Sequence, residues 1–305
     1  MNRILSFGSL NYDYVYQTDH FVQPKETLSA LSYRRGFGGK GLNQTIAMRK
    51  AGLAVYHAGR VGADGQPFVD YLTQNGVRTD YLVKDETAVT GHAIIEVCHG
   101  ENRILLHGGA NRLIDEAQID RTVAAFEAGD WLVIQNEISN IPYLIEAAKK
   151  QGLKVFFNAA PVAEEVHSYP LELVDVLCVN EVEGAFLAQT EEREFDKLAE
   201  ILHKRYSNAE ILLTVGAEGS YCVNQSGSWF VPSLKVNAVD TTAAGDTYSG
   251  FWLAEKIRSG DSHAAMRYAT RAASITVQRP GAAESIPTAE ELRQIGNCRA
   301  DARSR

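Results

Sequence analysis

The stretch from Val239 to Thr247 has the composition of a helix start that binds anions. Small residues at 241–245 lead into Asp246, and an apolar helical pattern follows. The first backbone N–H groups of a helix have no partner within it and carry partial positive charge, so they attract anions. Because Ala243, Ala244 and Gly245 cannot shield these amides, a phosphate group can approach them closely.

Asp246 lies at the mouth of this predicted anion site. A carboxylate beside an anion is electrostatically unfavourable unless it has a task there, such as accepting a proton. The alternative is structural, since Asp is among the residues favoured as helix N-caps. On this stretch alone, the N-cap is the favoured interpretation.

A second candidate site is the glycine-rich turn at residues 36–44, Gly-Phe-Gly-Gly-Lys-Gly-Leu-Asn-Gln. It matches GxGxxG formally, but no convincing buried strand precedes it, which disfavours a dinucleotide-binding fold. It is not a Walker A loop either, because Gly41 follows Lys40 where that loop has Ser or Thr. The open backbone, with donors from Lys40 and Asn43, suits a polyhydroxylated ligand. A plain turn before a helix is the alternative.

Strand and helix patterns alternate along most of the chain. This predicts an α/β fold with a doubly wound, mainly parallel sheet flanked by helices. Ligands bind such sheets at the carboxyl ends of the strands. The polar or glycine positions that close the predicted strands at this end, and so predict a ligand site, are Asp13, Glu137, Asn180, Glu183 and Gly216. As an alternative, Asn180 and Glu183 are consistent with an ordinary helix cap and a solvated helix face.

Two segments interrupt the alternation. Residues 14–35 contain Pro24 and alternate loosely, and residues 89–107 place apolar alternation on both sides of a His-Gly-Glu-Asn turn, which is typical of a hairpin. Together they predict a small β-sheet that covers the site as a lid. We expect one domain over residues 1–295, including this lid, and a polar tail at 296–305.

Composition excludes several classes of function. The 305 residues carry a net charge of −8 without a long basic run, which argues against nucleic acid as a partner. No apolar run is long enough to span a membrane. The 4 cysteines lie far apart without a CxxC pair, so zinc and a disulfide framework are poorly supported, and a cytoplasmic location with reduced thiols is expected.

These candidate residues are the parts of a phosphoryl-transfer site. Such chemistry depends on positioning and charge neutralisation more than on covalent participation by the protein. Asp246 would accept the proton of an attacking hydroxyl, and the amides of residues 243–245 would hold the transferring group. The pair Asn180 and Glu183 suits a hydrated magnesium ion.

With these residues identified, the sequence resembles the ribokinase-like (PfkB) carbohydrate kinases. Gly38 to Gln44 and Asp240 to Asp246 are similar to the two signatures of that family, in order and at the family's spacing. The resemblance covers about residues 3–295. Further segments that occur in family order are 11–13, 109–111, 135–137, 158–161, 180–183 and 214–219.

The resemblance implies a catalytic base at Asp246, with Ala243, Ala244 and Gly245 as the anion hole. It implies water-mediated binding of Mg²⁺ by Glu183, ATP as phosphoryl donor, and often a K⁺ site. The positions that match sugar contacts are Asn11, Asp13, Gly39, Lys40, Asn43 and Glu137. The positions that match nucleotide contacts are Asn180, Thr214, Gly216, Glu218, Gly219, Gly245 and Thr270. The positions that match the K⁺ site are Asp240, Thr242, Thr276, Arg279, Gly281 and Ser285.

Lys40 and Gln44, with the sequence Gly-Ala-Asn at 109–111, look like the ribokinase and deoxyribokinase branch. The resemblance therefore implies an ATP-dependent kinase for the primary hydroxyl of a pentose, first of all D-ribose, giving ribose 5-phosphate. Leu42 replaces the family's common Ala, and Thr270 stands where a His or Asn often flanks adenine. The alternatives are a kinase for deoxyribose, another furanose or a nucleoside, and a non-catalytic sugar- or nucleotide-binding regulator. Ribokinase lids pair between subunits, which implies a homodimer.

Overall fold

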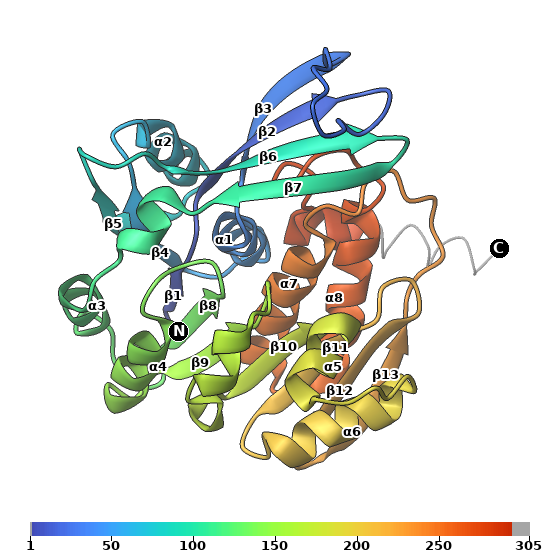
Figure 1. The fold of residues 1–305 in the computed structure, drawn as a ribbon. Helices are drawn as coiled ribbons and strands as arrows, with labels where there is room; N and C mark the ends of the chain where they lie inside the picture. The colour runs from blue at the N-terminus through green and yellow to red at the C-terminus, as the bar shows by residue number, and fades with distance from the viewer. Residues whose placement is uncertain (1, 295–305) are drawn as a thin grey trace.

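A nine-stranded sheet lies at the centre of the protein in the computed structural model, which describes residues 2–294 (Figure 1). Its strand order is β13-β12-β11-β10-β9-β8-β1-β4-β5. All neighbours from β11 to β5 are parallel, and β12 and β13 add an antiparallel hairpin at one edge. The predicted doubly wound, mainly parallel sheet is therefore confirmed. The strands are β1 (Ile4–Phe7), β4 (Val55–Val61), β5 (Arg78–Lys84), β8 (Trp131–Gln135), β9 (Lys154–Asn158), β10 (Val176–Asn180), β11 (Glu210–Thr214), β12 (Gly219–Asn224) and β13 (Gly227–Pro232).

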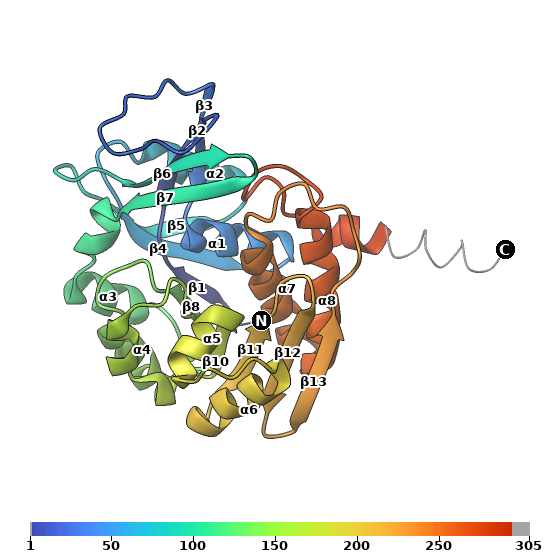
Figure 2. The ribbon, with the colours of Figure 1, turned by 45° about the vertical axis from the view of Figure 1, so that its right-hand side comes forward.

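Helices cover both faces of this sheet (Figure 2). Successive side chains of a strand point to opposite faces, so Trp131 and Val133 join one core cluster and Leu132 and Ile134 join the other. Helices α1, α2, α7 and α8 pack in the first cluster, and α3 to α6 pack in the second. The helices are α1 (Lys40–Lys50), α2 (Gln66–Gln74), α3 (Glu116–Val123), α4 (Ile141–Lys150), α5 (Glu181–Ala188), α6 (Phe195–Arg205), α7 (Ala244–Ser259) and α8 (Ser262–Thr276).

A separate four-stranded sheet lies beside α1, at the top of Figure 1. Its strand order is β3-β2-β6-β7, with β2 and β6 parallel and the two outer pairs antiparallel. The segments that break the α/β alternation in the sequence supply these strands. The strands are β2 (Asn11–Gln17), β3 (Ser32–Gly38), β6 (Gly91–Cys98) and β7 (Glu101–His107).

Several details differ from the sequence-based prediction. The pattern predicts helices that begin at 42 and 247, whereas α1 begins at Lys40 and α7 at Ala244. Strand β5 and helix α3 were not predicted; β5 is an edge strand with mixed exposure, so it lacks a buried apolar run. The tail predicted at 296–305 lies outside the described residues. No helix within residues 2–294 is long and apolar enough to cross a lipid bilayer.

Candidate active site

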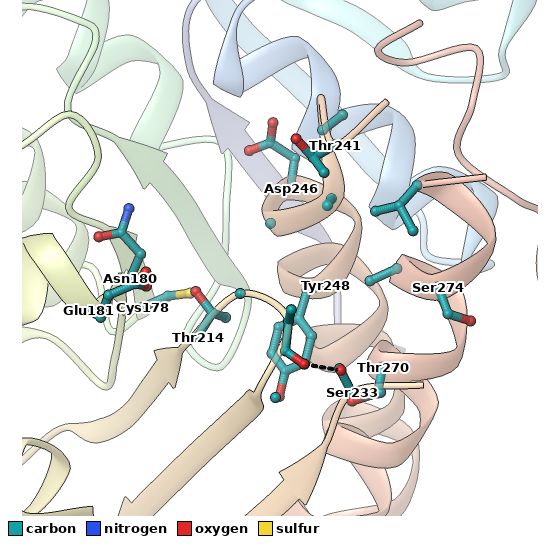
Figure 3. Close-up of a pocket in the computed structure, with 18 of the residues that line it drawn as sticks. Cys178, Asn180, Glu181, Thr214, Ser233, Thr241, Asp246, Tyr248, Thr270 and Ser274 are labelled. Carbon is teal, nitrogen blue, oxygen red and sulfur yellow. Dashed lines mark hydrogen bonds between the residues drawn. The ribbon is translucent and has the colours of Figure 1, made fainter. Parts of the chain in front are cut away.

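The carboxyl ends of β9, β10 and β11 border a cleft of about 810 Å³ (Figure 3). Strand β1 pairs with β4 on one side and with β8 on the other, so the chain winds away from β1 in both directions. Open α/β sheets bind ligands outside the carboxyl ends of their strands, and here the cleft lies at the ends of β9 to β11, not at the switch point on β1. The predicted site residues that line the cleft are Lys40, Asn180, Glu183, Thr214, Gly216, Gly219, Ala243, Ala244, Gly245, Asp246 and Thr270.

The start of α7 presents backbone amides to this cleft. No side chain caps the helix, and its N-cap residue Ala243 has a left-handed conformation with φ 60°. The amide of Ala244 donates to the Thr241 carbonyl, whereas no acceptor within residues 2–294 is found for the amides of Gly245 and Asp246. A Cβ added at Gly245 would meet no atom within 4 Å. The start of α7 can therefore hold an anion close to bare backbone.

Asp246, the third residue of α7, is held by side chains from α1. Asn43 Nδ2 donates to Asp246 Oδ2 over 3.0 Å, and Gln44 Nε2 donates to Oδ1 over 2.9 Å. The carboxylate does not cap its own helix, so the N-cap interpretation is wrong. Asp246 is only 7% exposed, yet it lines the cleft (Figure 3). Its carboxylate can therefore reach a hydroxyl bound there.

Glu137, which follows β8, connects the ends of β8 and β1 to α1. Its Oε2 accepts hydrogen bonds from the backbone amide of Lys40 over 3.0 Å and from the Ser9 hydroxyl. Burial raises the pKa of Glu137, and the nearby Asp246 adds to this effect, although Ser9 and Lys40 oppose it.

The Lys40 side chain lies among carboxylates. Burial disfavours its charge, but the carboxylates of Asp246, Glu137 and Glu183 outweigh burial and raise the pKa of Lys40. Lys40 therefore stays an ammonium ion and balances part of the negative charge in the cleft. Gly39, the residue before it, is the N-cap of α1 and has φ 96°, which suits glycine.

Asp13 on β2 lies against the glycine-rich turn. A Cβ added at Gly38 would be 2.1 Å from Asp13 Oδ2, so only glycine leaves room for this carboxylate. Burial and the nearby Glu137 raise the pKa of Asp13 to about 7, although Arg34 lowers it. Asp13 therefore changes its charge near neutral pH.

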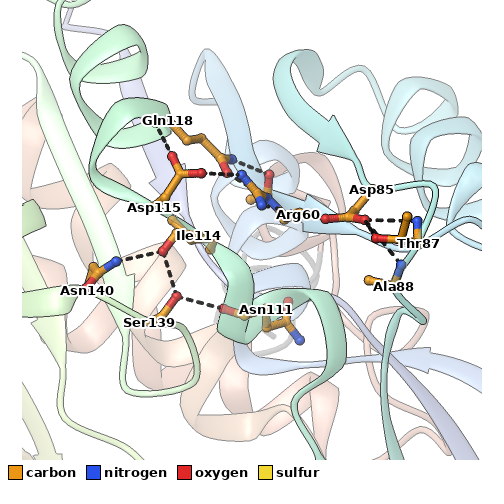
Figure 4. A network of polar contacts seen from close by, with 11 residues as sticks. Arg60, Asp85, Thr87, Ala88, Asn111, Ile114, Asp115, Gln118, Ser139 and Asn140 are labelled. Carbon is orange, nitrogen blue, oxygen red and sulfur yellow. Dashed lines mark hydrogen bonds and ion pairs between the residues drawn. The ribbon is translucent and has the colours of Figure 1, made fainter.

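Asn11, also on β2, is fixed by Asn111. Asn111 Nδ2 donates to Asn11 Oδ1 over 2.8 Å, and Asn111 Oδ1 accepts from the Leu10 amide over 3.1 Å. The Asn111 carbonyl accepts from the amide of Ser139, two residues after Glu137, over 3.1 Å. Figure 4 shows the polar network around Asn111 and Ser139. This network links two predicted sugar-binding segments.

Asn43 carries an acceptor without a partner. Its Nδ2 holds Asp246, but its Oδ1 is buried and has no hydrogen-bond partner within residues 2–294. Buried polar atoms are nearly always paired. A ligand hydroxyl that donates to Asn43 Oδ1 would satisfy this atom beside Asp246.

Asn180 and Glu183 border the opposite side of the cleft, where β10 meets α5. They form a reciprocal capping box: Glu183 N donates to Asn180 Oδ1 over 2.8 Å, and Asn180 N donates to Glu183 Oε2 over 2.9 Å. Both residues also line the cleft, so the cap and a ligand contact are compatible. Burial raises the pKa of Glu183, and the neighbouring acids Glu181 and Asp246 add to this. A cation at this side would relieve that repulsion.

The rest of the predicted nucleotide positions also line the cleft, with one exception, and their contact with a nucleotide stays a prediction. Glu218 is the exception, because it is absent from the lining and its backbone bonds Val215 and Ser233. Sequence reasoning missed the run of α8 residues that follows Thr270 at helical spacing, although that spacing was a usable signal. It also missed residues without any periodic signal. The missed lining residues are Cys178, Val179, Ser233, Leu234, Lys235, Val236, Ala238, Tyr248, Ala273, Ser274 and Val277.

Asp240 joins the loop before α7 to the loop after α8. Its Oδ1 accepts from the Thr242 amide over 2.9 Å, and its Oδ2 accepts from the Gly281 amide over 3.0 Å. Although burial opposes the charge, these hydrogen bonds lower the pKa of Asp240. The predicted K⁺ residues lie in or next to these two loops, where a carboxylate, carbonyls and hydroxyls supply only oxygen donors. Within residues 2–294, no group of three or more His, Cys, Asp or Glu side chains could hold a metal ion.

Known proteins resemble this chain in sequence and architecture. The family model for pfkB family carbohydrate kinases matches residues 1–289. The chain is 33% identical to a ribokinase of Haemophilus influenzae over 93% of this chain and 95% of that protein. It is 30% identical to a deoxyribokinase of Salmonella typhi over 95% of this chain and 97% of that protein. A ribokinase structure from Cryptococcus neoformans in complex with ADP matches with a TM-score of 0.85 and 30% identity, over 96% of this chain and 99% of that one.

Proposed function

Because the chain belongs to the pfkB family of carbohydrate kinases, we propose that it transfers the γ-phosphoryl group of ATP to the primary hydroxyl of a pentose. Family membership makes the protein a phosphotransferase that acts on an alcohol group of a sugar. D-Ribose is the proposed acceptor and ribose 5-phosphate the product, since the similar proteins include ribokinases.

One observation carries the proposal: a carboxylate fixed by two amides lies next to a helix start with free backbone N–H groups. Asp246 accepts the proton of the primary hydroxyl of the sugar while the hydroxyl oxygen forms a bond to the γ-phosphorus. The bond from that phosphorus to the β–γ bridging oxygen breaks, and ADP leaves. The amides at the start of α7 hold the transferring group as its charge shifts.

In this proposal the sugar and the nucleotide bind on different sides of Asp246. The sugar hydroxyls contact Asn11, Asp13, Lys40, Asn43 and Glu137, with the Gly39 backbone close by. Of the proposed sugar contacts, Lys40 lines the cleft, and the other residues lie outside its lining, with Glu137 bonded to Lys40 and Asn43 bonded to Asp246. The nucleotide occupies the side formed by Asn180, Thr214, Gly216, Gly219 and Thr270. The Glu183 carboxylate would hold Mg²⁺ through water, and the ion would neutralise charge on the phosphates.

We place a monovalent cation, K⁺, behind the anion site. The oxygen donors of Asp240, Thr242 and the loop 276–285 fit such an ion, and the hydrogen bond from Gly281 to Asp240 already brings the two segments together. Replacing K⁺ with tetramethylammonium is expected to lower turnover. Equal activity in the two salts would remove K⁺ from the proposal.

The small sheet is proposed as a lid over the sugar and as the surface of a homodimer. Strand β7 is exposed throughout, and Leu105 is 69% exposed, which is unusual for an apolar residue in a sheet without a partner. A monomer in sedimentation at micromolar concentration would contradict the dimer. A cytoplasmic location is also part of the proposal, because Cys98, Cys178 and Cys222 are buried free thiols.

A screen of acceptors tests the proposed reaction. ADP formation is measured with ATP, Mg²⁺ and K⁺ on ribose, deoxyribose, other furanoses and nucleosides, and the values of kcat/KM are compared. We expect ribose to have the highest value. The absence of turnover on every pentose, by protein that binds ATP, would refute the proposal.

Deoxyribose is the second candidate acceptor, because a deoxyribokinase is among the similar proteins. Leu42, the residue by which the signature departs from the family pattern, does not favour it directly. Its side chain is fully buried in the core and does not line the cleft. A higher kcat/KM on deoxyribose than on ribose would favour this candidate.

A further inference from the structure

Two fully buried glutamines stand behind Asp246, outside the cleft. Gln44 belongs to α1 and Gln135 is the last residue of β8; both are 0% exposed, and neither lines the cleft. Because both side chains are fully buried, they do not touch a ligand in the cleft directly. Their polar groups nevertheless form a chain that ends at the Asp246 carboxylate.

The chain has a defined direction. Gln135 Nε2 donates to Gln44 Oε1 over 2.7 Å, and Gln44 Nε2 donates to Asp246 Oδ1 over 2.9 Å. Asn43 Nδ2 serves the other carboxylate oxygen over 3.0 Å. Each oxygen of Asp246 thus accepts one amide hydrogen bond, and the plane of the carboxylate is fixed relative to α1.

Asp246 and Gln135 together determine which way the amide of Gln44 faces. If that amide were reversed, its oxygen would lie against the carboxylate and its NH₂ group against the NH₂ of Gln135, and both contacts would be repulsive. Because the NH₂ group of Gln135 occupies the oxygen end of Gln44, the donor end of Gln44 must face Asp246. The strand β8 therefore orients a side chain of α7 through α1.

Among the residues that the structure describes, the position of Gln135 leaves a buried acceptor unpaired, which is unfavourable for folding. Gln135 Oε1 is buried and has no hydrogen-bond partner within residues 2–294. A Cβ added at Gly8 would be 2.5 Å from this oxygen, so the neighbouring strand leaves room for it. An unpaired buried acceptor is unfavourable by about 1–3 kcal/mol, and an apolar side chain of similar shape would avoid that penalty.

The charges around Asp246 explain why it needs to be held. The carboxylates of Glu137 and Glu183 repel it and the Lys40 ammonium attracts it. A carboxylate that rotates to pair with an ammonium is a weaker base and no longer faces the acceptor hydroxyl. The side-chain amides of Asn43 and Gln44 hold the Asp246 carboxylate in place against the attraction of Lys40.

We propose that Gln44 and Gln135 are positioning residues, and that the chain Gln135–Gln44–Asp246 fixes the carboxylate in the orientation that receives the proton of the acceptor hydroxyl. The proposal rests on the proposed function, in which Asp246 is the base. Gln44 acts directly on Asp246, and Gln135 acts only through Gln44.

The experiment compares Gln44→Met, Gln135→Met and the double variant by steady-state kinetics. Gln44→Met is expected to lower kcat about ten- to hundredfold, the range for one hydrogen bond to a charged group. Gln135→Met is expected to lower kcat about three- to tenfold, because the Gln44 amide keeps a donor but loses its fixed orientation. The KM values for sugar and ATP are expected to stay within about twofold, since neither residue lines the cleft.

The double variant is the decisive measurement. Because Gln135 acts through Gln44, the double variant is expected to match Gln44→Met within about twofold. Losses that multiply would overturn the chain. Gln118→Met is the matched control: Gln118 is 1% exposed and bonds Gly59 and Arg60 on the far side of the sheet (Figure 4). It is expected to lower the unfolding temperature and leave kcat unchanged.

The single variants and Asp246→Asn also test the positioning role of the two glutamines. If Gln44→Met does not fold, Gln135→Met alone suffices: a lower kcat at constant KM supports the chain, and an unchanged kcat overturns it. Normal rates in both glutamine variants, with an inactive Asp246→Asn, would overturn the positioning role and leave the proposed function intact. A near-normal rate in Asp246→Asn would overturn both.

Discussion

The proposed acceptor side and the proposed nucleotide side, which meet at Asp246, are built by different means. On the acceptor side (β2, α1 and the loop after β8), side chains bond to one another, as Asn43 and Gln44 do to Asp246. Glycines there are tightly enclosed: a Cβ at Gly41 would be 2.2 Å from the Ser9 amide nitrogen. On the nucleotide side (the ends of β10 and β11, α8 and the start of α7), the lining is rich in small residues and bare backbone. A Cβ at Gly216 or Gly245 would meet nothing within 4 Å, whereas one at Gly219, where β12 begins, would be 2.2 Å from the Val231 carbonyl oxygen.

This difference follows from what each side must recognise. A sugar presents hydroxyls at fixed angles, so its donors and acceptors need side chains that cannot rotate. A phosphate chain presents charge that backbone amides at a helix start can hold without side chains. We therefore expect substitutions on the acceptor side to change the kinetic constants for the sugar strongly. Substitutions on the nucleotide side are expected to have smaller effects, and mainly on KM for ATP.

The largest effect is expected at Asp246, where the two sides meet. Asp246→Asn keeps the shape of the side chain but removes the proton acceptor, so kcat is expected to fall by about 10³-fold or more. Loss of an oxygen acceptor also disturbs the contacts with Asn43 and Gln44, and thermal unfolding checks that the fold persists. A rate within tenfold of the unmodified protein would exclude Asp246 as the base.

The next largest effect is expected at Glu137, on the acceptor side alone. Glu137→Gln removes a charge that faces Ser9 and the Lys40 amide, so KM for the sugar is expected to rise about ten- to hundredfold. KM for ATP is expected to change less than about twofold. Glu127→Gln is the matched control, since Glu127 is 89% exposed at the opposite end of the sheet. Equal effects on both KM values would break the division into two sides.

Sequence reasoning was effective where the signal is local. The helix start before Asp246, the polar residues at strand ends and the Asn180–Glu183 cap each depend on residues a few positions apart, and the structure places most of them around one cleft. The segments that form the small sheet could be recognised because Pro24 and the turn at 99–102 break the α/β alternation.

Contacts between residues far apart in the sequence could not be predicted from local patterns. Gln44 and Asp246 are 202 residues apart in sequence, and Gln44 and Gln135 are 91 apart, so only the folded sheet brings them together. The segment 233–238 lines the cleft as irregular backbone, which has no periodicity to detect. Strand β5 was missed because an edge strand needs no continuous apolar run.

The pH dependence of kcat/KM for the sugar is expected to show a smaller effect, of about tenfold, from the ionisation of Asp13 on the acceptor side. Burial raises the pKa of Asp13 to about 7, so the carboxylate form that accepts sugar hydroxyls grows as pH rises from 6 to 8. The value of kcat/KM for the sugar is expected to rise about tenfold over that range. Since the raised pKa means that ionisation disfavours the folded state, the contribution of Asp13 to the stability of the sugar-free protein is expected to fall as pH rises from about 4 to about 7 and to level off above that.

Asp13→Asn provides the control for this profile. It removes the titrating group, and the rise in kcat/KM near pH 7 is expected to disappear, while the profile for ATP keeps its shape. A sugar profile that still rises near pH 7 in Asp13→Asn would assign the titration to another acid, such as Glu137.

The smallest change in activity is expected from a single methyl group on the nucleotide side. Gly245→Ala adds a Cβ in open space at the anion site, so the fold is expected to keep its stability while KM for ATP rises about two- to fivefold, as a phosphate is pushed away from the α7 amides. Gly41→Ala adds the same methyl group against Ser9 and is expected to cost about 1–3 kcal/mol of unfolding free energy. Thermal unfolding and ATP kinetics on both variants compare the sides directly. If Gly245→Ala destabilises the fold as much as Gly41→Ala, the nucleotide side is as tightly packed as the acceptor side, and its open backbone is not the feature that binds phosphate.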